Sequence, residues 1–219
     1  MTLSNEAKGG FMRQSKGFSL IELMIVMGIV LIITAIALPI YKNAMDSIHL
    51  QEAARKYAGI LQRGRLTAVT GNTYNAIGVQ FLNNTCPGTC NLIAYIDTAD
   101  TNVSPPTNYA NPEPMVVLGT GVSFVDSSVA PATSDLLAKV FPNHGPQTLG
   151  YPPVFGSRGL PCNPVNVTGG TVCNTQGLNA AFATYFQSAQ GKWEAVSVNP
   201  VGRVQLWSYD PNAAAWTQL

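Results

Sequence analysis

An uncharged, apolar run near the N-terminus constrains this chain more than any other feature. Residues 23–38 hold no charged side chain, and Thr34 is the one clearly polar residue among them. As a helix, residues 18–40 would be about 34 Å long, enough to cross a hydrocarbon core of about 30 Å. Charged residues precede the run: Glu6, Lys8, Arg13 and Lys16. Because this flank is net positive, we expect the N-terminus in the cytoplasm and the rest of the chain across the inner membrane.

Three interpretations of the run compete: a cleavable secretory signal, a plain single-span anchor, and a span that is kept and has a task of its own. Ala35-Ile36-Ala37 fits the small-x-small site of a secretory signal. Glu22 opposes the first two, because a carboxylate at the head of a membrane span is costly and normally marks a function. The alternative for Glu22 is a side chain that only snorkels to the lipid head groups.

The residues ahead of the run read Gly17-Phe18-Ser19-Leu20-Ile21-Glu22-Leu23. This order resembles the processing motif of type IV prepilins and type II secretion pseudopilins. The resemblance implies cleavage between Gly17 and Phe18 by prepilin peptidase, N-methylation of Phe18, and retention of residues 18–40 as a membrane-spanning or filament-core helix. Residues 1–17 would form the leader, and Met12 is an alternative start that would shorten it.

Glu22 gains a role in assembly from such a cut. Residues four apart share a helix face, so the new amine of Phe18 can pair with Glu22 within one chain. Between chains, Glu22 of one subunit can pair with the amine of its neighbour, which removes two charges from lipid together. Leaving either charge alone would cost several kcal/mol. We therefore predict that Glu22 sets the register of packed helices.

Residues 41–72 predict an amphipathic continuation of the helix. Pro39, which precedes them, should kink the helix without ending it. Apolar residues recur at spacings of three and four: Leu50, Ala53, Ala54, Tyr57, Ala58 and Leu61. We expect this stripe to pack on the chain's own distal domain, and the alternative is a face that binds a membrane surface or a partner. The helix should end near residues 70–72, where Gly71 can supply the final turn.

Residues 73–219 predict a β-rich domain, which gives the α+β class: a long helix packed on antiparallel strands. Short β-type runs alternate with turn residues. The expected strands are 74–81, 92–96, 115–118, 122–125, 181–186, 193–198 and 203–209. The last three form a meander of antiparallel strands. Residues 99–114 and 143–170 are rich in loop residues.

Two segments near the C-terminus narrow the resemblance. Phe155-Gly156-Ser157-Arg158-Gly159 and the turn that carries Gly202-Arg203 resemble segments of the GspH/FimT group of minor pilins and pseudopilins. That resemblance implies a long helix packed on a β-sandwich-like domain of two sheets. Arg158 and Arg203 are candidate contacts for a neighbouring subunit or for DNA, and they could equally be solvated turn residues.

The four cysteines form two sequence-local pairs, Cys86/Cys90 and Cys162/Cys173. An even number of cysteines in an exported chain indicates disulfides, and the local pairing is one of three connectivities. Zinc is the rival interpretation, although neither spacing matches the usual knuckle.

Candidate ligands for calcium lie in one loop (Asp97, Asp100 and Asn102), without a complete loop motif. The two histidines, His49 and His144, have no evident partner in the sequence. We predict no bound metal and no cofactor.

No phosphate loop, nucleophile elbow or zinc-protease helix occurs in the sequence, so we do not expect an enzyme. The leading hypothesis is a minor structural subunit of a type IV pilus or type II secretion pseudopilus. Its partners would be other subunits, prepilin peptidase and the inner membrane, with the C-terminal domain in the periplasm. The alternative is a minor pilin that binds DNA for uptake. Beyond Gly71, seven acidic residues outnumber four basic ones, which disfavours DNA as a partner.

Overall fold

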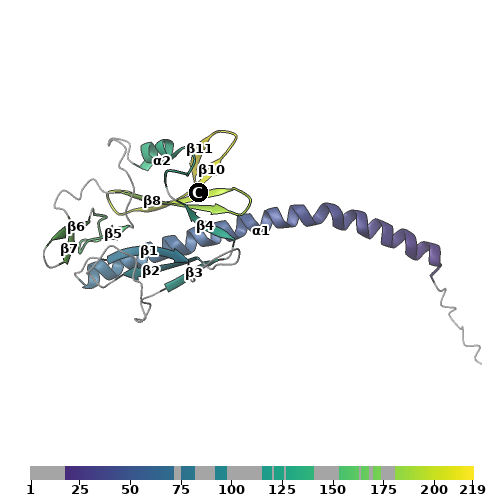
Figure 1. Ribbon diagram of the computed structural model, residues 1–219, viewed down its shortest axis with the longest axis horizontal. Coiled ribbons are helices and arrows are strands. Elements are labelled where there is room, and N and C mark those ends of the chain that lie inside the picture. Colours follow the sequence, from purple (N-terminus) through teal and green to yellow (C-terminus); the bar gives the residue numbers. More distant parts are fainter. Residues whose placement is uncertain are drawn as a thin grey trace, which may run out of the picture. The chain divides into compact units, whose positions relative to one another are not determined.

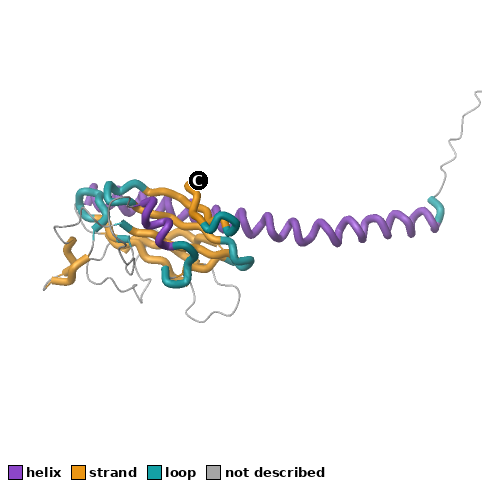
Figure 2. Tube along the Cα trace, turned by 90° about the horizontal axis from the view of Figure 1, so that it is seen from above, coloured by secondary structure: helices purple, strands orange, loops and turns teal. Residues whose placement is uncertain are grey.

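The structure is a computed structural model that describes most of the chain in ten stretches. These are residues 18–71, 75–81, 92–97, 115–119, 121–125, 127–140, 153–162, 164–167, 170–173 and 181–219. The chain divides into one unit of residues Met1–Lys42 and a second, larger unit of residues Asn43–Leu219. Figures 1 and 2 show the helix of the first unit and the helices and strands of the second.

One long helix, α1 (Leu20–Gly71), contributes to both units. The chain stays helical through Pro39, and the kink expected there stays a prediction. Gly71 is the last helical residue, as the sequence predicted. From Phe18 to Ala44 every side chain is exposed, whereas the burial that begins at Leu50 follows the predicted stripe.

A four-stranded antiparallel sheet in the order β3-β2-β1-β5 forms one part of the second unit. Its strands are β1 (Asn75–Phe81), β2 (Leu92–Asp97), β3 (Met115–Gly119) and β5 (Val154–Phe155). Ala94 and Ile96, which alternate along β2, both face the core. The first three strands match the predicted ranges, while β5 lies in a region predicted only as loop-rich.

A five-stranded antiparallel sheet in the order β11-β10-β9-β8-β4 forms the other part. Its strands are β4 (Val122–Val125), β8 (Phe182–Ser188), β9 (Trp193–Val198), β10 (Val204–Asp210) and β11 (Ala215–Gln218). Strands β8, β9 and β10 are the predicted meander, in which Val196 lies opposite Thr184 on one side and Leu206 on the other. This confirms the α+β class, with the long helix packed on an antiparallel sheet.

The core of the second unit is built around the C-terminal half of α1. The predicted stripe is buried together with Ile60, Gly64 and Ala68. It packs with side chains of both sheets: Ala94, Ile96, Leu118, Val122, Phe155, Phe186, Val196 and Val198. The stripe therefore serves its own domain, as expected, and not a membrane surface.

A second apolar cluster covers the opposite face of the five-stranded sheet. Tyr185 and Ala195 belong to it, one residue away from Phe186 and Val196 of the first core, as the two-residue period of a strand requires. Helix α2 (Thr133–Val140) contributes Leu136 to this cluster. Neither α2 nor β11 was predicted.

A small hairpin joins β6 (Pro164–Val167), which lies within the region predicted as loop-rich, to β7 (Gly170–Cys173), which begins at the last residue of that region. Cys162, just before β6, is disulfide-bonded. Its predicted partner Cys173 closes β7, and the pairing stays a prediction. Cys86 and Cys90 lie outside the described residues.

Candidate assembly site on the N-terminal helix

The candidate site begins where α1 begins. Phe18 lies two residues ahead of α1, and Glu22 is the acidic residue of its first turn. The backbone N–H of Leu23 donates to the carbonyl oxygen of Ser19 at 3.1 Å, so helical bonding starts directly after Phe18. A carboxylate in the first turn is favoured by the positive end of the helix dipole. Gly17 lies outside the described residues.

The next five turns of α1 present apolar side chains on every side. From Leu20 to Ile40 the large hydrophobic side chains are 52–77% exposed. The Thr34 hydroxyl donates to the carbonyl oxygen of Val30 at 2.7 Å, so this polar group is satisfied inside the helix. Among the described residues, α1 is the helix that is long and apolar enough to cross a membrane. A surface of this kind needs lipid or other helices around it.

The helix is fixed in the second unit by a few specific contacts. The Tyr57 and Thr184 hydroxyl oxygens lie 3.1 Å apart, and the Tyr57 ring meets Phe186 edge-on at 5.3 Å between centroids. Burial raises the pKa of Tyr57 far above its ordinary value, so the phenol stays neutral. Near the start of the unit, the Lys192 ammonium donates to the carbonyl oxygen of Asn43 at 3.0 Å.

Glu194 is a buried carboxyl on β9. It is 3% exposed, and its Oε2 has no hydrogen-bond partner among the described residues. Burial raises the pKa of Glu194 to about 7, although the positive charge of Arg55 on α1 opposes that shift. Sequence reasoning missed this group, because a glutamate in an alternating strand normally predicts an exposed position.

Two glycine turns meet over the last turns of α1. The Arg65 guanidinium donates through Nη1 to the carbonyl oxygen of Gly202 at 2.8 Å. Gly159 and Gly202 have φ values of +70° and +80°. A Cβ at Gly159 would lie 2.7 Å from Val69 Cγ2, and one at Gly202 would lie 2.9 Å from the Gly159 carbonyl oxygen. Only glycine fits both the backbone conformation and the space.

This contact brings together the two segments that carry Arg158 and Arg203. Both arginine side chains are exposed, and within the described residues neither makes a side-chain hydrogen bond or ion pair. Arg65, which joins the two turns, was not predicted to matter. The signal for it was weak: one basic residue near the end of an amphipathic helix.

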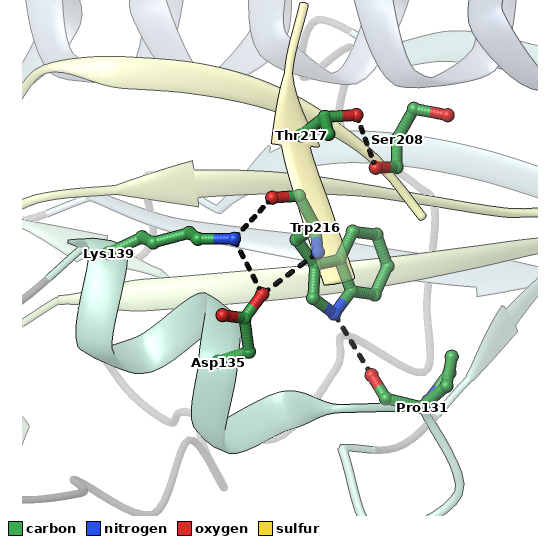
Figure 3. Close-up of polar contacts among 6 residues, drawn as sticks. All are labelled: Pro131, Asp135, Lys139, Ser208, Trp216 and Thr217. Atoms are coloured by element: carbon green, nitrogen blue, oxygen red, sulfur yellow. Dashed lines mark hydrogen bonds and ion pairs between the residues drawn. The ribbon is translucent and has the colours of Figure 1, made fainter. Parts of the chain in front are cut away.

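A polar clamp holds the C-terminal strand to α2 (Figure 3). Asp135 Oδ2 accepts from the Lys139 ammonium at 2.7 Å and from the backbone N–H of Trp216 at 2.9 Å. Lys139 also donates to the Trp216 carbonyl oxygen at 2.6 Å, and the Trp216 indole donates to the Pro131 carbonyl oxygen at 2.9 Å. The bonds from Lys139 and Trp216 lower the pKa of Asp135. The clamp is structural, because Trp216 is fully buried.

The candidate metal ligands are only partly placed by the structure. Asp97 ends β2, and His49 lies in α1. Asp100, Asn102 and His144 lie outside the described residues. Among the residues that the structure describes, no three histidine, cysteine or carboxylate side chains lie close enough together to hold a metal ion.

Comparison with known families gives one match. The model of the prokaryotic N-terminal methylation motif matches residues 12–38, which contain Gly17, Phe18, Glu22 and the apolar run. No curated protein and no solved structure matches the chain significantly. The match therefore concerns the N-terminal segment and leaves the second unit to be interpreted from its own geometry.

Proposed function

We propose that this chain, which carries the N-terminal signal of type IV pilin-like proteins, is a minor structural subunit of a type IV pilus or type II secretion pseudopilus. It would be cut after Gly17 by prepilin peptidase, methylated on the Phe18 amine, and held in the inner membrane by the first half of α1. It would then enter a filament through the same helix, with its C-terminal unit on the outside.

The observation that carries the proposal is the match at residues 12–38 on a helix whose apolar side chains are exposed on all sides. A cleavable secretory signal would be removed together with its apolar segment. Here the apolar segment continues without a break into the helix that forms the core of the second unit. A signal-peptidase cut after Ala37 would interrupt α1 and remove its first half, whereas a cut after Gly17 leaves the whole helix intact.

Glu22 is proposed to pair with the Phe18 amine of a neighbouring subunit. A bare carboxylate among the exposed apolar side chains of α1 would be costly in lipid or in a packed helical core. An amine created at Phe18 supplies the opposite charge at one end of the same segment. The pairing would fix the axial register between subunits, because only one stagger satisfies both charges.

The minor rank of the subunit is supported by the contact between the two GspH/FimT-like segments. Gly159 and Gly202 meet through Arg65 of α1, so the sequence features that suggested the group form one structural unit. The choice between pilus and secretion pseudopilus depends on the genes around it: secretion-pathway neighbours would favour a pseudopilus, and pilus-assembly neighbours a pilus.

The first test replaces Gly17 with Ala in the full chain, in cells that contain a prepilin peptidase. We expect the variant to keep the mass of the precursor. Mass spectrometry of the unaltered chain should instead show a methylated Phe18 at its N-terminus. Gly28→Ala is the matched control, because a Cβ there meets nothing within 4 Å and the position lies beyond the cut. A mature mass for Gly17→Ala would refute the processing step.

The second test addresses assembly. Glu22→Ala should be processed normally, but its amount in filaments recovered by shearing should be at least ten times lower than that of the unaltered chain. Glu52→Ala is its control, since Glu52 is exposed on α1 and pairs with Lys56 at 2.7 Å. Normal incorporation of the Glu22 variant would remove the proposed role of the carboxylate.

A further inference from the structure

A mixed basic and aliphatic surface lies where the two glycine turns meet α1. We call it the arginine–valine patch, and it consists of Arg65, Leu66, Val69, Arg158, Val201 and Arg203. Three separate segments contribute to it. The atoms that join them are Arg65 and the closely apposed backbones of Gly159 and Gly202.

The aliphatic side chains of the patch are largely exposed to solvent. Val201 is 67% exposed, Leu66 63% and Val69 46%. Leu66 and Val69 are three residues apart and so share a face of α1. Val69 lies against Gly159, and Val201 directly precedes Gly202, which itself lies against Gly159, so the segments that carry these side chains meet at one place. Clustered exposed aliphatic side chains mark an interaction site more often than scattered ones do.

The charge of the patch is positive, because it contains three arginines and no acidic residue. Arg158 and Arg203 are exposed, and Arg65 is partly exposed with one nitrogen already bonded to Gly202. The second unit as a whole, residues 43–219, is close to neutral, with nine acidic and eight basic residues. A local positive spot on such a background steers an acidic partner to one position.

We propose that the arginine–valine patch binds an acidic surface with exposed aliphatic side chains on a different, neighbouring filament subunit. The partner class rests on the proposed function. Aliphatic side chains would pack against Leu66, Val69 and Val201, while carboxylates would receive bidentate hydrogen bonds from the arginines.

The same chemistry argues against two other occupants. Single-stranded nucleic acid is held by aromatic side chains that stack on bases, and the described patch offers valine and leucine in their place. The same patch of a second copy would set arginine against arginine, which is repulsive in a self-complementary contact. A contact between two different surfaces is the arrangement that satisfies both the charges and the apolar area.

The test places a photo-crosslinking amino acid at Val201 in the full chain, in cells that assemble the filament. Val129 is the matched control, because it is 66% exposed but lies just before α2. We expect an adduct at Val201 with another protein that has a methylated N-terminus, and at least tenfold less at Val129. Arg158→Glu with Arg203→Glu should lower the Val201 adduct at least tenfold, and the two Arg→Lys changes should lower it less.

Several results would overturn the patch. An adduct with a second copy of this chain, an adduct sensitive to nuclease, or equal adducts at Val201 and Val129 would each do so. So would the absence of an adduct from chains recovered in filaments with the mature mass. Mature mass and filament content are measured in the same cells, so a chain that is never cut or never assembled would instead refute the proposed function, and the partner class with it.

Discussion

The two halves of α1 share one helix and differ in everything that surrounds it. In the first half, large branched side chains are exposed around the whole circumference, as at the consecutive positions Ile29, Val30 and Leu31. In the second half, the buried face is made mostly of small residues: Ala53, Ala54, Ala58, Gly64 and Ala68. Small residues let two sheets approach the helix closely, whereas large aliphatic ones suit contact with lipid.

If the first half of α1 serves assembly as proposed, stability and assembly depend on different halves of one helix. The larger core of the second unit includes side chains that α1 buries from Leu50 onward, so its free energy of unfolding depends on them. The first half adds nothing to that core among the described residues, so its sequence is free to serve the membrane and the filament. The predictions below separate the two contributions.

The largest effect should follow from Tyr57→Ala. Tyr57 is fully buried, meets Phe186 and shares a hydrogen bond with Thr184, so its removal leaves a cavity and an unpaired hydroxyl. We expect a loss of about 3–5 kcal/mol in the free energy of unfolding. Urea denaturation of the full chain in detergent micelles, followed by tryptophan fluorescence, measures it.

Tyr57→Phe is the control for that substitution, because it keeps the ring and removes only the hydroxyl. A loss of about 1 kcal/mol is expected from the missing hydrogen bond. If both variants unfolded like the unaltered protein, the second half of α1 would not be the stabilising half.

Glu194→Gln should stabilise the protein at high pH. Because burial raises the pKa of Glu194 from 4.5 to about 7, the folded state binds this proton more tightly than the unfolded state. Stability from this group is therefore full below pH 4.5 and is lost as the pH rises to about 7. At pH 8 we expect the variant to gain about 2 kcal/mol, and below pH 4.5 almost nothing.

The control for this pH dependence is Glu52→Gln, which changes an exposed carboxylate on α1. It should leave the difference in stability between pH 8 and pH 4.5 almost unaltered. A Glu194 variant whose gain does not vary with pH would show that the carboxyl is not buried against α1 in its charged form.

The sequence predicted the helix and its stripe because both depend on local periodicity. The spacing from Leu50 to Leu61 could be recognised without knowing what covers it, and the same is true of the meander after Phe182. The N-terminal processing motif was likewise readable, because its residues are consecutive.

Other features depend on contacts between distant residues. Helix α2 spans eight residues, too short for a periodic signal, and it depends on packing and on its clamp to Trp216. Arg65 and Gly202 are 137 residues apart in sequence, so no local pattern could join them. The burial of Glu194 was also hidden, since the covering helix comes from the other end of the chain.

Asp135→Ala should have a smaller effect, since it removes the clamp and leaves the core intact. Its two hydrogen bonds, from Lys139 and from the backbone N–H of Trp216, are partly exposed, so about 1 kcal/mol of stability should be lost at pH 7. The pKa of Asp135 is lowered, so this contribution is lost as the pH falls below 3.8, opposite in sign to Glu194. Ser134→Ala, at an exposed neighbour, is the control. Equal losses from both variants would contradict a specific clamp.

The smallest effect on unfolding should come from Ile29→Ala, in the exposed half of α1. Its side chain is 52% exposed and contributes to neither core cluster, so the free energy of unfolding should change by less than about 0.5 kcal/mol. Leu61→Ala, a comparable truncation in the buried half, should cost about 2–5 kcal/mol. If the filament content of Ile29→Ala falls while its free energy of unfolding is unchanged, the two halves are separable. The first half would then contribute to assembly without contributing to the stability of the second unit. A loss of stability at Ile29 similar to that at Leu61 would show that the first half also packs on the domain.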